Sequence, residues 1–193
     1  TTAYNTLAGQ AVTAELTGQD LGGLTLNAGV YSFSSSAELT GTLTLDAQGD
    51  PLASFVFQIG STLTTATNSS VVIINGGDDC NVFWQVGSSA TLGTTTAFKG
   101  NIVALTSITL TTGASLSGRA LARNGAVTMD TNVISTLLCG TTGGGGSGSD
   151  AGIPADAAVE TGDACVDAPP PIDAAVDAPC DADMTPNPDH DAH

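Results

Sequence analysis

A threonine-centred repeat constrains this chain more than any other feature of its sequence. Six short segments align on a central threonine, and the steps between these threonines are 19, 20, 27, 18 and 19 residues. Three short strands and three corners occupy about 18 to 20 residues, which is the length of one turn of a parallel β-helix. We therefore expect each segment to be one rung of a stack. The central residues are Thr25, Thr44, Thr64, Thr91, Thr109 and Thr128.

Two further columns keep the same register. One is apolar and follows Gln58 at steps of 27, 19 and 18 residues, through residues 82–87, 101–106 and 119–124. Residues 75–79 account for the long step, because their glycines and aspartates predict an inserted surface loop. Together the columns predict an all-β fold, a parallel β-helix (β-solenoid) of about six coils. The other column, with steps of 27, 18 and 18 residues, consists of Val71, Phe98, Leu116 and Ile134.

The threonine column predicts an outward face without charge. Side chains on a strand point to alternate faces, and the residues that flank the central threonine are apolar in five of the six segments, Thr65 being the exception. The flanking residues therefore point inward and the threonines outward. We predict that these threonines, with outward residues two places before them, form the binding face. The predicted residues are Thr25, Thr42, Thr44, Thr62, Thr64, Ser89, Thr91, Ser107, Thr109 and Thr128.

A secondary column lies three residues after the last four central threonines. Two interpretations stay open: the column continues the face past a corner, or it marks the turns. Its members are Thr67, Thr94, Thr112 and Thr131.

The apolar column has apolar side chains on both faces of its strands, as in residues 55–57 and 82–84. A strand that is apolar on both sides is covered on both sides. We expect a helix to pack outside this face, and residues 1–9 are the only helix-like segment that remains. Most of the covering element is therefore expected to be missing from this chain.

The charge of the chain argues against two classes of partner. The formal net charge is −16, and the only basic residues are Lys99, Arg119 and Arg123. Nucleic acids and anionic membrane surfaces are bound through clustered lysine and arginine, so we expect neither as a partner. The chain has no apolar run long enough for a membrane span, so we expect no membrane insertion. It has no signal sequence at its start, so either the signal was removed or the chain is an incomplete piece.

Composition divides the chain into two parts. Residues 1–140 hold eight acidic and three basic residues, whereas residues 141–193 hold eleven acidic residues and no basic one. A Gly/Ser-rich linker opens the second part, and the Asp, Ala and Pro that follow cannot bury enough apolar surface to fold. We predict a β-solenoid over residues 1–140 and a disordered linker and acidic tail over residues 141–193.

The four cysteines divide equally between the two parts. Three connectivities are possible, and we favour the pairs Cys80 with Cys139 and Cys165 with Cys180. The alternative for the first pair is two unpaired thiols. A disulfide suits an oxidising compartment, which favours a secreted or cell-surface protein.

The first 140 residues lack the groups that catalysis needs. They contain no histidine, and the equivalent positions Asp46 and Asp130 lie about four rungs apart, on the order of 19 Å, too far to act together. Asp78 and Asp79 favour solvation of a loop over Ca²⁺ binding, and the two histidines near the C-terminus are a weak signal for a metal. We expect no enzyme activity, no cofactor and no metal.

Eight stretches of the sequence carry a family resemblance. They are Ala-Tyr-Asn at 3–5, Asp-Leu-Gly-Gly at 20–23, Gly-Val-Tyr at 29–31, and the longer stretches 39–46, 55–61, 81–87, 100–106 and 118–127. In these residues the chain resembles the secreted microbial ice-binding-protein-like family, over about residues 3–139. The resemblance implies a right-handed, three-faced solenoid with a long helix against one face, secretion and, in many members, adsorption to ice. Coils and most of a helix normally precede Ala3 in that family, so the chain is expected to be N-terminally incomplete.

Two functions stay open for such a chain. The favoured one is an ice-binding protein, acting in antifreeze or in inhibition of ice recrystallisation, that adsorbs as a monomer to the ice crystal surface. Ice offers no charge and no pocket, so a rigid face of threonines with restricted χ1 suits it. Rungs about 4.8 Å apart and alternate residues about 6.7 Å apart resemble repeats of the ice lattice. The alternative is an extracellular structural or adhesive solenoid, since threonine and serine also suit outward strand positions.

Overall fold

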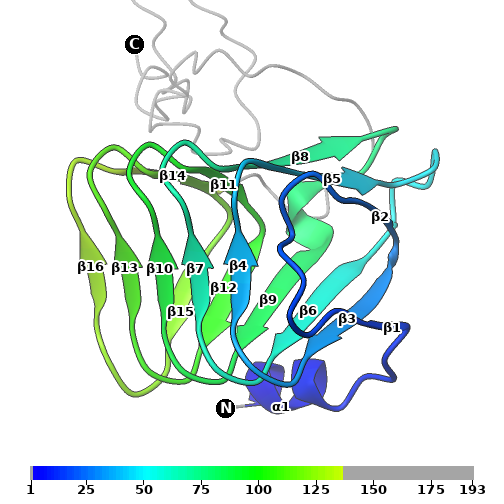
Figure 1. Ribbon diagram of the computed structural model, residues 1–193, viewed down its shortest axis with the longest axis horizontal. Helices are drawn as coiled ribbons and strands as arrows, with labels where there is room; N and C mark the ends of the chain where they lie inside the picture. Colours follow the sequence, from blue (N-terminus) through cyan, green and yellow to red (C-terminus); the bar gives the residue numbers. More distant parts are fainter. Residues whose placement is uncertain (1, 137–193) are drawn as a thin grey trace, which may run out of the picture. The chain divides into compact units, whose positions relative to one another are not determined.

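The computed structural model describes residues 2–136, which wind into a parallel β-solenoid that opens with one short helix, α1 (Thr2–Ala8) (Figure 1). Each complete coil contributes one strand to each of three sheets, A, B and C, and successive coils add parallel strands to all three. The predicted all-β parallel solenoid is confirmed. The predicted boundary between residues 140 and 141 and the predicted acidic tail lie outside the described residues.

The strands of each sheet follow one another in stacking order. Sheet A contains β1 (Ala14–Glu15), β3 (Gly29–Phe33), β6 (Phe55–Ile59), β9 (Val82–Val86), β12 (Asn101–Ala104) and β15 (Ala120–Ala122). Sheet B contains β4 (Ala37–Leu39), β7 (Leu63–Thr65), β10 (Ala90–Leu92), β13 (Ile108–Leu110) and β16 (Val127–Met129). Sheet C contains β2 (Thr25–Asn27), β5 (Thr42–Asp46), β8 (Ser70–Ile74), β11 (Ala97–Lys99), β14 (Ser115–Ser117) and β17 (Val133–Ser135).

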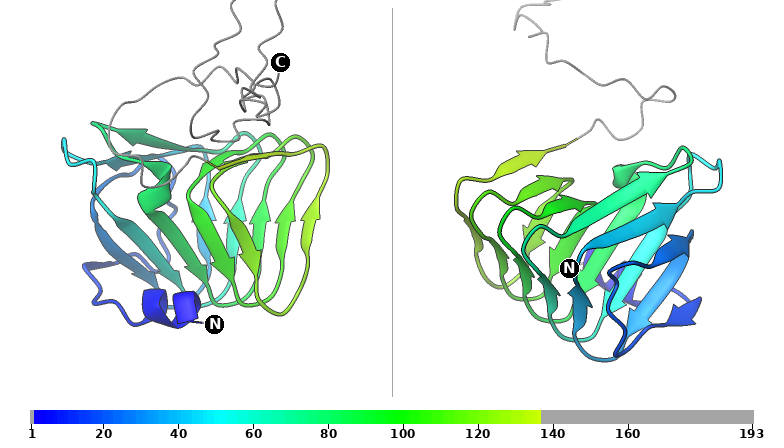
Figure 2. Two further views of the ribbon diagram at one scale, coloured as in Figure 1. Left: turned by 180° about the vertical axis from the view of Figure 1, so that it is seen from behind. Right: turned by 45° about the horizontal axis from the view of Figure 1, so that its top comes forward.

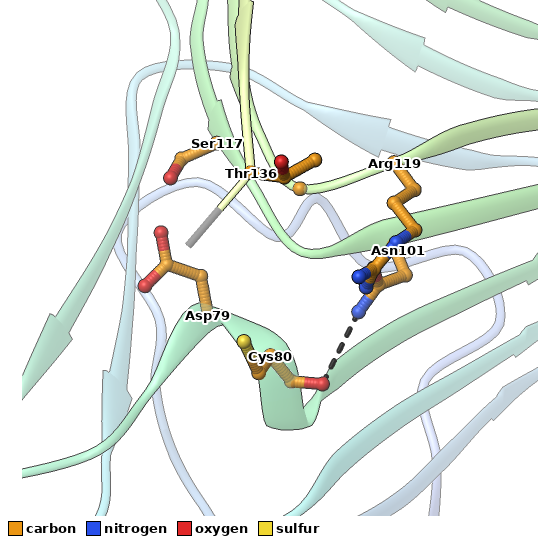
Figure 3. A pocket seen from close by; sticks show the side chains of 7 residues that line it. Asp79, Cys80, Asn101, Ser117, Arg119 and Thr136 are labelled. Carbon is orange, nitrogen blue, oxygen red and sulfur yellow. Dashed lines mark hydrogen bonds between the residues drawn. The ribbon is translucent and has the colours of Figure 1, made fainter. Parts of the chain in front are cut away.

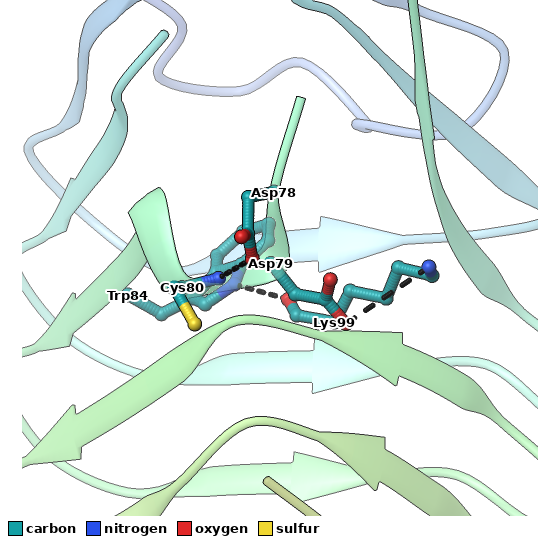
Figure 4. A network of polar contacts seen from close by, with 5 residues as sticks. All are labelled: Asp78, Asp79, Cys80, Trp84 and Lys99. Atoms are coloured by element: carbon teal, nitrogen blue, oxygen red, sulfur yellow. Dashed lines mark hydrogen bonds and ion pairs between the residues drawn. The ribbon is translucent and has the colours of Figure 1, made fainter. Parts of the chain in front are cut away.

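The core is a ladder of inward side chains with an aromatic stack at its centre. Tyr31, Phe57 and Trp84 are register partners on β3, β6 and β9, and their ring centroids lie 5.5 and 3.9 Å apart. Phe98 on β11 adds a fourth ring, 4.8 Å from that of Trp84. The Trp84 Nε1 donates a hydrogen bond to the carbonyl oxygen of Lys99 at 3.0 Å (Figure 4). Because the rings are stacked and this buried donor is paired, each rung fixes the position of the next.

Helix α1 covers part of the outer face of sheet A, as the view from behind in Figure 2 shows. Its Leu7 is buried against Val56 of β6 and Val103 of β12. The Gln58 side chain donates through Nε2 to the carbonyl oxygens of Leu7 at 2.8 Å and of Gln10 at 2.9 Å, which satisfies acceptors that a helix end leaves free. A helical cover on the strands that are apolar on both faces was predicted, and it is confirmed.

The predicted single column of six threonines is wrong, because its members lie on two sheets. Thr25 and Thr44 pair with each other in sheet C, in line with Val72. Thr64 belongs to sheet B, where its partner in the preceding coil is Glu38. Strands of both sheets alternate outward polar and inward apolar residues, so periodicity alone does not separate the sheets. The corner lengths decide, since the corner between β4 and β5 has two residues and the one between β7 and β8 has four.

The other two predicted columns fare better. The sheet A column has the predicted strands but is one residue out of register, because Gln85 pairs with Val103 and not with Ala104. Side chains alternate along a strand, so this slip exchanges inward and outward residues. The column from Val71 to Ile134 is confirmed.

The two ends of the stack differ in how they are covered. At the N-terminal end Leu16 and Leu21 are buried. At the other end Met129 is 56% exposed, although its register partner Leu110 in the preceding coil is buried. Within residues 2–136, no further coil packs on this last rung.

Candidate functional site

The outer face of sheet B presents threonine at the same position on four consecutive rungs. Thr64, Thr91, Thr109 and Thr128 are successive partners in the parallel register of β7, β10, β13 and β16. These four strands lie side by side in Figure 1. Parallel pairing in register sets their side chains about 4.8 Å apart along the stack.

A second polar column runs beside the first, two residues earlier in each coil. The backbone N–H of Leu63 donates to the carbonyl oxygen of Ser89 at 3.1 Å, and that of Ala90 donates to Ser107 at 2.9 Å. The rungs therefore keep their register into the corner. The two columns, called the sheet B array below, consist of Thr62, Thr64, Ser89, Thr91, Ser107, Thr109 and Thr128.

Buried neighbours fix the direction of the array side chains. Leu63, Ala90, Leu92, Ile108 and Leu110 flank the threonines of the first three rungs, and each is at most 1% exposed. Because these flanking residues point into the core, the threonines between them point to the surface, as the sequence predicted. The array is uncharged, and a β-branched side chain leaves its hydroxyl and methyl groups little freedom in χ1.

The remaining three predicted residues, Thr25, Thr42 and Thr44, lie on sheet C, apart from the array. Thr42 shares a hydrogen bond with the hydroxyl of Ser70 at 2.9 Å. Further along that sheet, the outward positions are occupied by Val72, which is exposed, and by Lys99. Sheet C thus presents mixed chemistry, with an aliphatic and a cationic side chain on its face.

The secondary column lies at the corner between sheets B and C. The backbone N–H of Thr95 donates to Thr112 at 3.1 Å, but the next rung places Asp130 opposite Thr112, because Gly113 donates to the Asp130 carbonyl oxygen at 3.2 Å. The membership of Thr131 is therefore wrong, since the last corner is one residue shorter. Thr67, Thr94 and Thr112 are exposed next to residues with positive φ, so they mark a turn.

Comparison with known proteins identifies the family. Over residues 1–135 the sequence matches the family described as Ice-binding-like. The chain belongs to the ice-binding-like family. It is 72% identical over 135 residues to an ice-binding protein of Nostoc sp. (strain HG1), covering 69% of this chain and 50% of that protein. It is 37% identical over 134 residues to an ice-binding protein of Colwellia sp., covering 68% of this chain and 52% of that protein.

Solved structures agree with this assignment. The crystal structure of an ice-binding protein from the Antarctic ascomycete Antarctomyces psychrotrophicus superposes with a TM-score of 0.68 at 43% identity, over 69% of this chain and 66% of that one. An ice-binding protein from an Antarctic biological consortium gives a TM-score of 0.68 at 51% identity, over 70% and 62%. The chain of this ice-binding-like domain spans about half the length of the curated relatives it matches.

The N-terminal end of the array face is charged in this ice-binding-like domain. Glu38 stands in register with Thr64, and Asp20 forms a parallel bridge with Glu38 on its other side. The Asp20 Oδ1 accepts hydrogen bonds from the backbone N–H groups of Gly22 at 2.7 Å and Thr40 at 2.8 Å. Burial raises the pKa of Asp20, but hydrogen bonds from Gly22 and Thr40 outweigh this effect and leave the pKa below its ordinary value.

Sequence reasoning missed this acidic end, although a signal for it exists. Glu38 is exposed between the buried Ala37 and Leu39, so the short segment has the same alternation of apolar and polar residues as the threonine rungs. The repeat was aligned on threonine, and a rung without threonine was therefore passed over.

The inserted loop of the ice-binding-like domain is anchored by a polar network (Figure 4). Asp78 Oδ1 accepts from the backbone N–H of Cys80 at 2.8 Å, and Asp79, which is buried, lies 4.0 Å from the Lys99 ammonium. Cys80 is disulfide-bonded; its predicted partner Cys139 lies outside the described residues, so that pairing stays a prediction. The predicted pairing of Cys165 with Cys180 lies outside them as well.

Cys80 also borders a small cavity beside the network, with Asn101, Ser117, Arg119 and Thr136 around it (Figure 3). Among residues 2–136 no three His, Cys, Asp or Glu side chains are grouped to hold a metal ion. No helix in this range is long and apolar enough to cross a membrane. The chemistry of the domain therefore centres on its hydroxyl surface.

Proposed function

We propose that this domain binds ice through the sheet B array, and that the whole protein inhibits ice growth or recrystallisation. The observation that carries the proposal is the uncharged pair of hydroxyl columns, kept in register over β7, β10, β13 and β16. The names of its relatives, ice-binding proteins of bacteria and fungi, support the same function.

The physics of adsorption explains why this surface suits ice. Rungs repeat at about 4.8 Å and alternate outward residues at about 6.7 Å, close to repeats of the ice lattice. A threonine methyl group orders nearby water while the hydroxyl binds it, and restricted χ1 leaves little entropy to lose on adsorption. A single hydroxyl contributes little, but many acting at once on a rigid stack give strong attachment.

The proposal extends to the setting in which the protein works. We infer that it is a secreted monomer that acts on the ice crystal surface without catalysis and without a cofactor. A disulfide at Cys80 supports an oxidising compartment. A flat array needs no second subunit to complete it, because all its rungs come from one chain.

A matched pair of substitutions tests the proposal in the full chain. Thr91→Tyr places a bulky ring at the centre of the array, and Thr44→Tyr places the same ring at an outward strand position on sheet C. We expect Thr91→Tyr to lower thermal hysteresis at least about fivefold, because the ring keeps the other rungs from engaging together. Thr44→Tyr is expected to leave it unchanged.

Circular dichroism and thermal denaturation of both variants check that the solenoid remains folded. Equal loss in the two variants, or loss in Thr44→Tyr alone, would move the binding surface away from sheet B. Unmodified ice growth in a concentrated solution of the unsubstituted protein would reject ice binding altogether.

A further inference from the structure

Two acidic residues occupy the array face where the threonine column ends. The register runs from Asp20 to Glu38, Thr64 and onward to Thr128, so a charged part and an uncharged part share one straight line. Both Asp20 and Glu38 are exposed. The face therefore changes character abruptly between β4 and β7.

The geometry alone does not end the array at β4. Glu38 is the direct partner of Thr64, and Ser36 shares a hydrogen bond with Thr62 between their hydroxyl groups at 2.8 Å. Backbone pairing also continues, because the N–H of Ala37 donates to the carbonyl oxygen of Thr62 at 2.9 Å. The scaffold thus offers a fifth rung with the right backbone and with a serine already in the second column.

A carboxylate at that rung opposes adsorption for two reasons. Its charge is strongly hydrated, and removing that hydration is costly unless a partner replaces it. Among the described residues, the one ion pair is between Lys99 and Asp79, so no cation pairs with Glu38 across this face. Asp20 beside it adds a second negative charge, which reinforces local hydration.

We propose that Glu38, supported by Asp20, sets the N-terminal limit of the ice-binding surface and confines adsorption to the rungs β7, β10, β13 and β16. This inference rests on the proposed function and adds a specificity-determining residue to it. Removing the charge at position 38 extends the array by one rung without altering the fold. Threonine is also the better strand former at an exposed strand position.

The test compares Glu38→Thr and Glu38→Gln with the unsubstituted chain by thermal hysteresis and by ice recrystallisation. Glu38→Gln removes the charge alone, whereas Glu38→Thr also supplies the hydroxyl and methyl groups of the array. We expect Glu38→Thr to raise thermal hysteresis at least about 1.2-fold, since one rung is added to contacts that act together. Glu38→Gln is expected to give a smaller gain.

A matched control is available in Glu15→Thr. Glu15 is an exposed strand residue on β1 of sheet A, so this variant makes the same change of charge away from the array. We expect it to leave thermal hysteresis unchanged. Thermal denaturation of each variant shows whether the solenoid is retained.

The outcomes separate this inference from the proposed function. If the unsubstituted chain binds ice and Glu38→Thr brings no gain, the limit set by Glu38 is rejected and the function of the array stands. A gain in Glu38→Thr with Glu38→Gln at the unsubstituted level, or an equal gain in Glu15→Thr, also rejects it. If neither the unsubstituted chain nor Glu38→Thr affects ice growth, both proposals fail, whereas activity in Glu38→Thr alone supports the limit.

Discussion

Thr95 adopts a left-handed backbone conformation with φ of 55°, at the corner between sheets B and C. A β-branched residue is strained in that region, which Asn tolerates better. Asn68 occupies the same corner position one coil earlier, with φ of 59°. The Thr95 hydroxyl hydrogen-bonds to the Asn68 side chain and to the Thr94 carbonyl oxygen, which offsets part of the strain.

We predict that Thr95→Asn stabilises the domain. The free energy of unfolding should rise by about 1 kcal/mol, because the substitution relieves left-handed strain that costs roughly 1–2 kcal/mol. Chemical denaturation measures the change. Thr94→Asn is the control, since Thr94 is exposed and has no positive φ. A Thr95→Asn variant less stable than the parent would mean that the hydroxyl contacts outweigh the strain.

At the scale of elements, α1 depends on sheet A for its position. A helix of seven residues is too short to be stable alone in water. It is held by the burial of Leu7 against Val56 and Val103 and by two hydrogen bonds from Gln58. These contacts also explain why a polar residue occurs among the apolar residues of β6.

We predict that Gln58→Ala loosens α1 while the solenoid stays folded. Two hydrogen bonds of about 1 kcal/mol each are lost, so the helix opens more often. Hydrogen exchange of the amides in residues 5–10 should speed up several-fold, with little change in the strands. Gln19→Ala, at an exposed turn position, provides the comparison. Unchanged exchange in residues 5–10 would show that apolar burial alone holds the helix.

At the scale of the whole molecule, stability depends on how the N-terminal end of the stack is closed. The Asp20 carboxylate accepts hydrogen bonds from Gly22 and Thr40, and these hold its pKa below the ordinary value although burial acts in the opposite direction. A carboxyl group with a lowered folded-state pKa stabilises the fold above its unfolded-state pKa. That contribution is lost as the pH falls through the folded-state pKa.

The free energy of unfolding should therefore decrease between about pH 5 and about pH 2, and less steeply in Asp20→Asn. An asparagine keeps an oxygen acceptor at this position but does not titrate. Urea denaturation at several pH values measures both slopes. Identical slopes in the two proteins would assign the acid sensitivity to other carboxylates, such as Asp130, whose pKa is lowered by hydrogen bonds from Thr112 and Thr131.

The sequence by itself determined the architecture and the chemistry of the binding face. A repeat of about 18 to 20 residues fixes a solenoid, because that length fits three short strands and three corners and little else. Alternation within each rung also fixes which side chains point outward, since strand geometry has a period of two. Thr64, Thr91, Thr109 and Thr128 were therefore placed correctly in one outward column.

The tertiary structure alone decided which rungs share a sheet. Sheets B and C carry the same local pattern, and a difference of two residues in one corner moves Thr25 and Thr44 to sheet C and brings Glu38 into line with Thr64. Register is a property of hydrogen bonds between distant segments and of core packing, which local periodicity does not encode. The array and its acidic end are consequences of that register.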